Sequence, residues 1–143
     1  MSRQKNIFYK VAKDENSTTE IFCNLLGNKF FRDKFLEKFL DQKFISNIRY
    51  EEDINTQYCS THGRPDLIIE NETVKIIVEV KIDKYRGLTP KQPDGYLKEL
   101  EESAQNNKWL IFLIPKGYVH FGEDDLEKIR SKYSHADIKI EIV

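Results

Sequence analysis

Apolar residues near the start of the chain recur at helical spacing. The segment NSTTEIFCNLLGN, residues 16–28, predicts a short helix with Ser17 as N-cap, Glu20 closing a capping box and Gly27 ending the helix. Residues 29–44 repeat phenylalanine every four positions beside leucines, which predicts a second, amphipathic helix whose aromatic stripe belongs to the core.

The pattern then changes to the alternation of strands. Residues 45–58 alternate loosely and predict a half-exposed strand, whereas residues 64–70 and 73–82 are rich in Ile and Val and predict an antiparallel hairpin that turns at Asn71. The Gly- and Pro-containing residues 85–95 predict a loop.

Helices and strands alternate in the last third of the chain. Residues 96–107 have helical spacing, 109–115 form a continuous apolar run typical of a strand covered on both faces, 123–133 predict a helix, and 137–143 alternate as a last strand. The order is α-α-β-β-β-α-β-α-β, which predicts an α/β fold with a central mixed sheet flanked by helices.

Composition limits the class of protein. The 143 residues suit one domain, 1–143, and no run is apolar enough to span a membrane. The N-terminus lacks the apolar centre of a signal peptide, so we expect a cytoplasmic protein without membrane partners. Cys23 and Cys59 have no zinc-binding spacing. Because the chain ends on an apolar strand, a piece of a longer protein stays an alternative.

Charge gives only a local signal. The formal net charge of −1 excludes binding of nucleic acid by bulk positive charge, but residues 75–91 carry a surplus of three positive charges. Taken alone, such a run is more simply explained as a solvated basic edge.

Three charged residues interrupt the predicted hairpin. Glu79 and Lys81 are two residues apart in one strand and therefore share a face. If Asn71 and Glu72 are the central turn residues, Asp66 pairs with Ile77 and becomes a diagonal neighbour of Glu79 on that face. A loop of odd length would place Asp66 and Glu79 on opposite faces.

Two carboxylates on one face are hard oxygen ligands that suit Mg²⁺ or Mn²⁺. Lys81 beside them could orient or help deprotonate a water, or neutralise charge that develops on a phosphate. The alternative is a water-exposed face on which the three charges form ordinary cross-strand ion pairs. Burial of both faces would argue against that alternative, because unpaired buried charge is costly.

The residues RPDLII, followed by EVK thirteen residues after Asp66, resemble the PD-(D/E)XK nuclease superfamily, whose fold is called restriction-endonuclease-like. The resemblance covers about residues 14–115 and implies that Asp66, Glu79 and the carbonyl of Val80 bind a metal and that Lys81 is the catalytic lysine. It also implies a metal-site role for Glu20, which the capping box explains without catalysis.

A glutamine followed four residues later by an aromatic residue occurs in some branches of the superfamily, and Gln92 and Tyr96 have this spacing. The first helix also looks like that of a bacterial branch linked with restriction or phage defence. His62, beside the site strand, could contact a phosphate, although a solvated loop histidine explains it as well.

The expected function is therefore metal-dependent hydrolysis of phosphodiester bonds in nucleic acid, with DNA as the first candidate and a homodimer or partner domain as a possible assembly. Two alternatives stay open. One is a nuclease-fold binding or assembly module that cuts nothing without a partner, and the other is a metal-free α/β domain with a coincidental motif.

Overall fold

The computed structural model describes residues 15–56, 64–81, 94–114, 127–128, 130–131 and 138–142. These residues form an α/β fold with a five-stranded mixed sheet and helices, as the sequence predicts. The helices are α1 (Glu15–Leu26), α2 (Lys29–Leu36), α3 (Gln42–Ile45), α4 (Tyr50–Asp53) and α5 (Asp94–Glu102). The strands are β1 (Ile54–Thr56), β2 (Leu67–Glu70), β3 (Val74–Val80), β4 (Asn107–Leu113) and β5 (Ile138–Ile142).

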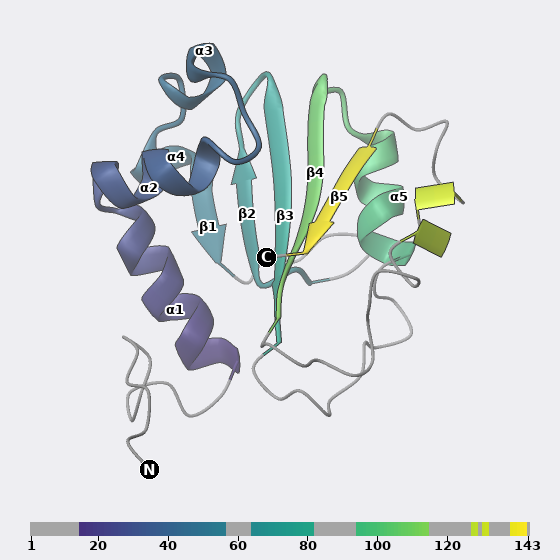
Figure 1. Ribbon diagram of the computed structural model, residues 1–143, viewed down its shortest axis with the longest axis horizontal. Helices are drawn as coiled ribbons and strands as arrows, with labels where there is room; N and C mark the ends of the chain where they lie inside the picture. Colours follow the sequence, from purple (N-terminus) through teal and green to yellow (C-terminus); the bar gives the residue numbers. More distant parts are fainter. Residues whose placement is uncertain are drawn as a thin grey trace.

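The strands lie side by side in sequence order, from β1 to β5 (Figure 1). β1, β2 and β3 pair antiparallel, whereas β3, β4 and β5 pair parallel. A parallel neighbour needs a crossover connection, and α5 lies in the connection from β3 to β4. The predicted mixed sheet is therefore confirmed.

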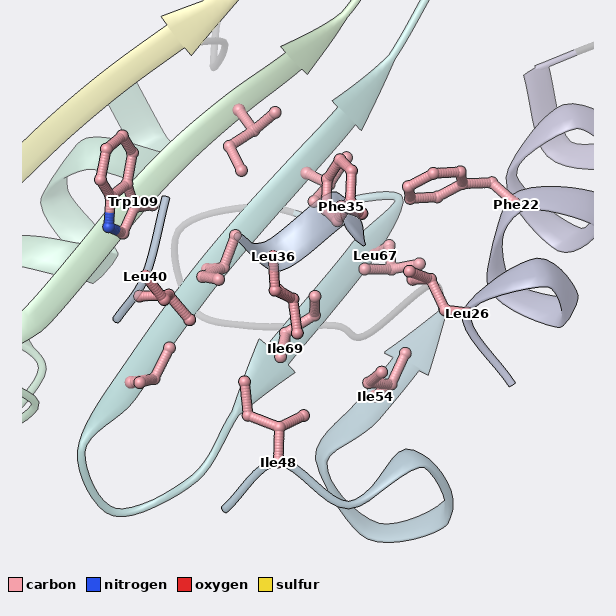
Figure 2. Close-up of a cluster of buried hydrophobic side chains, with 14 of the residues drawn as sticks. Phe22, Leu26, Phe35, Leu36, Leu40, Ile48, Ile54, Leu67, Ile69 and Trp109 are labelled. Carbon is pink, nitrogen blue, oxygen red and sulfur yellow. The ribbon is translucent and has the colours of Figure 1, made fainter. Parts of the chain in front are cut away.

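One face of the sheet packs against the N-terminal helices. Figure 2 shows side chains of α1 and of the segment around α2 pointing onto β2 and β3. Alternate residues of the strands supply the other half of this core. Its members include Phe22, Leu26, Phe35, Leu36, Leu40, Leu67, Ile69, Val74, Ile76, Val78, Val80, Trp109 and Ile111.

The opposite face packs against α5, which Figure 1 shows beyond β5 and away from α1 and α2. Its core uses the remaining alternate positions of the strands, namely Ile68, Ile77, Leu110, Phe112 and Ile140, together with Tyr96, Leu97 and Leu100 of α5. Every residue of β3 is buried, since both faces of that strand are covered. Charged residues of β3 are therefore inside the fold.

The first predicted helix is present, but its predicted start is wrong. Residues 15 and 16 are already helical, so Ser17 lies inside α1 and is not its N-cap. Thr19 and Phe22, three residues apart, are both buried on one face of α1. Gly27 ends the helix as predicted, and a Cβ added there would lie 3.1 Å from the Tyr50 ring.

The prediction of one helix over residues 29–44 is wrong. α2 ends at Leu36, and the Leu36 carbonyl accepts hydrogen bonds from both Phe39 N and Leu40 N, each over 2.9 Å. This turn brings Phe39 edge-on to Trp109, with ring centroids 5.1 Å apart. If the helix continued past Leu36, Phe39 would not reach Trp109. Tertiary packing therefore overrides the helical pattern of the sequence.

The strand predicted over residues 45–58 is much shorter. Within the described residues it is limited to β1, Ile54–Thr56, and α4 precedes it. The buried carboxylate of Asp53 accepts a hydrogen bond from Arg49 N over 2.7 Å and so favours a helical turn there. Residues 57 and 58 lie outside the described part.

The β2–β3 hairpin has an even loop, as predicted, but its register differs by two residues. Leu67 pairs with Val78, and Asn71 N donates to Val74 O over 3.0 Å, so Glu72 and Thr73 form the loop. The Asn71 side chain explains the shift, because Oδ1 accepts from the backbone N of Thr73 and of Val74, each over 2.9 Å. Asparagine favours the position before the central turn residues.

The later elements follow the predicted order. α5 covers Asp94–Glu102 and so is shorter at its C-terminal end than predicted, β4 is covered on both faces, and β5 is a strand. Residues 127–128 and 130–131 are helical, and Arg130 Nη2 donates to the Ile140 carbonyl oxygen over 2.6 Å, which ties this segment to β5.

Candidate functional site

Asp66 and Glu79 lie on the same face of the sheet. Continuing the observed register by one pair beyond Leu67 and Val78 places Asp66 directly opposite Glu79. The sequence predicts a diagonal arrangement of the two residues instead. A shift of two residues preserves the face on which each side chain lies. The expectation of a shared face is confirmed, and opposite faces, the arrangement of the coincidental-motif alternative, are excluded.

Asp66 is held against the backbone of β3. Its Oδ2 accepts a hydrogen bond from Val80 N over 2.7 Å, a charge-assisted bond that orients the carboxylate at the end of the strand. Asp66 is half-buried, whereas Glu79 is only 3% exposed. Asp66 is thus the more accessible of the two carboxylates.

Lys81 completes the trio that the sequence predicts. Its Nζ lies 3.7 Å from Glu79 Oε1, and the side chain is almost fully buried. The Lys81 backbone N donates to the Leu113 carbonyl oxygen over 2.9 Å, which extends the pairing of β3 with β4. A water-exposed face with ordinary ion pairs does not describe this buried lysine and glutamate.

Tyr96 brings α5 into the site. Its hydroxyl donates to the Arg64 carbonyl oxygen over 3.1 Å, and it also hydrogen-bonds the Glu79 carboxyl. The sequence indicates that Tyr96 faces the site, because of its spacing from Gln92, but assigns it no contact. Helical periodicity could not show which strand residue it meets.

The two carboxyls repel each other as ions. Burial and the negative charge of Asp66 raise the pKa of Glu79 to about 8, although Tyr96 and Lys81 favour its charged form. Burial also raises the pKa of Asp66, against the hydrogen bonds from Val80 and Glu79. When Glu79 carries a proton it donates a hydrogen bond to Asp66, so the pair shares a proton in the absence of a cation.

The donor chemistry of the pair fits a hard divalent cation. Asp66 and Glu79 supply carboxylate oxygens, and a cation between them would relieve the repulsion that raises their pKa values. Among the described residues, however, no group of three His, Cys, Asp or Glu side chains is arranged to hold a metal ion. Other ligands would have to be water, the substrate or backbone carbonyls such as that of Val80.

Glu20 is exposed on α1, and its role in the site stays a prediction. α1 packs on the face of the sheet opposite to Glu79, although the N-terminal half of α1 lies at the same end of the sheet as the end of β3 (Figure 1). Burial raises the pKa values of Cys23 and Tyr50, and the negative charge of Glu20 adds a smaller effect in the same direction. Glu20 is not among the described groups that shift the pKa of Asp66 or Glu79.

Several predicted residues lie outside the described part of the chain. They are Cys59, His62, Gln92 and the basic residues 84, 86 and 91. The possible roles of Gln92 and His62 therefore stay predictions.

Comparisons of this chain with protein-family models, with curated proteins and with solved structures found no match. Among the described residues, no helix is long and apolar enough to cross a membrane.

Proposed function

We propose that this protein is a metal-dependent nuclease that hydrolyses phosphodiester bonds in nucleic acid, with DNA as the first substrate to test. The observation that carries the proposal is the direct opposition of Asp66 and Glu79, with Lys81 beside them in a buried position. Burying charged groups at the end of a central strand costs stability, and such groups with perturbed pKa values are typical of functional sites.

The arrangement of elements supports a restriction-endonuclease-like core as the finer description of the fold. A helix, three antiparallel strands, a helix and a parallel strand follow one another along the chain. Pro65 and Asp66 directly precede β2, and the EVK residues lie at the end of β3 and directly after it. The two motifs thus lie at neighbouring ends of two paired strands, as the superfamily resemblance implies.

The residues would divide the chemistry among them. Asp66 and Glu79 would hold Mg²⁺ or Mn²⁺, which supplies Lewis-acid stabilisation of phosphate charge and acidifies a water. Val80 N fixes the orientation of Asp66, and Tyr96 fixes that of Glu79. Lys81 would orient a water or neutralise charge that develops on the phosphate, and Glu20 and Gln92 are proposed to support the site.

Cleavage of plasmid, linear duplex and RNA in Mg²⁺ or Mn²⁺, with chelator as control, tests the proposal. We expect Glu79→Gln and Lys81→Met each to reduce the cleavage rate by at least about 100-fold, the usual cost of losing a catalytic group. Glu37→Gln and Lys29→Met remove the same groups from exposed positions on or next to α2 and should leave the rate unchanged.

Two results would overturn the proposal. Cleavage that survives in Glu79→Gln would place the activity elsewhere, and a wild-type protein that cuts no substrate with either metal would contradict a nuclease active on its own. Nucleic-acid binding without cleavage would instead support the binding or assembly module.

A further inference from the structure

A second group of charged residues lies on the same face of the sheet as the candidate site. Lys75 of β3 is 8% exposed, and its Nζ lies 2.8 Å from Glu70 Oε2 on β2 and 3.2 Å from Glu99 Oε1 on α5. Burial opposes the charged form of Lys75, but the hydrogen bonds and negative charges of Glu70 and Glu99 outweigh it and raise the pKa of Lys75. The three residues, Glu70, Lys75 and Glu99, form a charged triad that joins β2, β3 and α5.

The triad and the site share two elements. Lys75 and Glu79 lie four residues apart on one face of β3, and Glu99 and Tyr96 lie three residues apart on α5. Lys75 and Glu79 are about 13 Å apart along β3, whereas Glu99 and Tyr96 are only about 4.5 Å apart along α5. The contacts Lys75–Glu99 and Glu79–Tyr96 therefore both reach a single turn of the helix. Displacing α5 along β3 would break both contacts.

Stability alone does not account for this triad. A buried ion pair is often no more stabilising than apolar residues of similar volume, whereas loss of one partner leaves an uncompensated charge. Moreover, the buried Glu99 Oε2 accepts no hydrogen bond within the described residues. A half-satisfied buried carboxylate is a poor source of stability, but its contact with Lys75 is made only when α5 lies at this height along β3.

We propose that Lys75 is a positioning residue for the Asp66–Glu79–Lys81 site. By holding Glu99, it sets where α5 lies along β3 and so places the Tyr96 hydroxyl against the Arg64 carbonyl and the Glu79 carboxyl. Its influence on cation binding rests on the proposed function, while its influence on the position of α5 does not.

The test compares Lys75→Met with Lys75→Arg at a temperature at which both variants are fully folded. One readout, without metal, is the NMR signal of the Val80 amide, which donates to Asp66, together with the ring signals of labelled Tyr96. The other is the dissociation constant of Mn²⁺ alone, measured by titration. We expect Lys75→Met to shift both sets of signals and to raise the Mn²⁺ dissociation constant about tenfold, the lower end for residues that orient ligands.

Lys75→Arg keeps the positive charge. If this variant has the wild-type Val80 and Tyr96 signals and the wild-type Mn²⁺ dissociation constant, the positioning role of Lys75 is supported. Lys139→Met removes an exposed lysine that lies over Trp109 and should change neither readout. If Lys75→Met does not fold, Glu99→Gln carries the same test, because it keeps the shape of the side chain but removes the negative charge that pairs with Lys75.

Unchanged Val80 and Tyr96 signals in a Lys75→Met protein that merely melts earlier would overturn the inference, since the triad would then be structural only. If the wild type binds no Mn²⁺, the proposed function fails, but the metal-free signals still decide whether Lys75 positions α5.

Discussion

Glu79 has neighbours of both signs in a position that water hardly reaches. Asp66 opposes its charged form, whereas Lys81 and the Tyr96 hydroxyl favour it, and burial decides the balance by raising its pKa to about 8. The charge state of the Asp66–Glu79 pair near neutral pH therefore depends on whether a cation is bound between the two carboxyls. A cation would favour two ionised carboxylates, and its absence favours a shared proton.

The stability of the metal-free protein should fall as pH rises from about 5 to 8. The folded pKa of Glu79 lies above its ordinary value of 4.5, so in this window the folded protein holds a proton that the unfolded chain releases. The raised pKa of Asp66 acts in the same direction. The slope for one group is at most about 1.4 kcal/mol per pH unit. Urea unfolding in chelator at several pH values measures it.

Glu79→Gln should flatten that dependence, because the amide cannot titrate and can still hydrogen-bond the Tyr96 hydroxyl. Glu37→Gln, at an exposed position, is the matched control and should retain the wild-type slope. A wild-type slope that persists in Glu79→Gln would show that other groups govern the pH dependence.

Strand periodicity alone predicts that Glu79 and Lys81 share a face. The sequence places Asp66 on that face only if the hairpin loop is even, and the structure shows an even loop. The sequence could not predict the contact between Tyr96 and Glu79 or the pairing of Lys75 with Glu99. Those contacts depend on where α5 docks on the sheet, which is a tertiary distance that no spacing along the chain encodes. Lys75 therefore looked like one member of a basic run.

At the scale of elements, the β2–β3 turn determines which residues face each other at the site. Asn71 Oδ1 accepts hydrogen bonds from the backbone N of Thr73 and of Val74 and from the Thr73 hydroxyl, the last over 3.2 Å. These bonds place the loop at Glu72 and Thr73 and so bring Asp66 opposite Glu79. Moving the loop by one residue would invert every side chain of the following strand.

Asn71→Ala should lower the free energy of unfolding by about 1 to 2 kcal/mol, because two backbone N–H groups lose their acceptor. Asn71→Asp keeps an acceptor oxygen and should retain most of the stability. Chemical denaturation of the three proteins measures the difference. Asn47→Ala, which removes one exposed hydrogen bond to the Lys43 carbonyl, is the control. Equal losses in Asn71→Ala and Asn71→Asp would argue against the acceptor role.

The helices show where sequence pattern alone is insufficient. Phenylalanines spaced by four suggest a single helix over residues 29–44, yet Phe39 and Leu40 gain more by folding back onto Trp109 and the sheet. The strands were easier to predict, since β3 and β4 are buried on both faces and read as continuous apolar runs. Periodicity identifies the elements, and packing decides where each helix ends.

At the scale of the whole molecule, the sheet separates two apolar cores that do not share side chains. The first core joins α1 and α2 to β2 and β3, and the second joins α5 to β3 and β4. β3 contributes to both through alternate residues, so each core supports the strand that carries Glu79. Loss of either core should therefore disturb the same strand.

Unfolding of the described sheet and helices should thus be a single cooperative transition. Far-UV circular dichroism and the fluorescence of Trp109, the one tryptophan of the chain, should report the same midpoint in urea. Ile69→Ala in the first core and Leu97→Ala in the second should each lower the free energy of unfolding by about 2 to 5 kcal/mol. In each variant the urea midpoints from circular dichroism and from fluorescence should fall by the same amount. Phe30→Ala, at a side chain 73% exposed, should change the free energy of unfolding by less than about 0.5 kcal/mol. A Leu97→Ala protein that loses helical signal before Trp109 fluorescence changes would show that the two cores unfold separately.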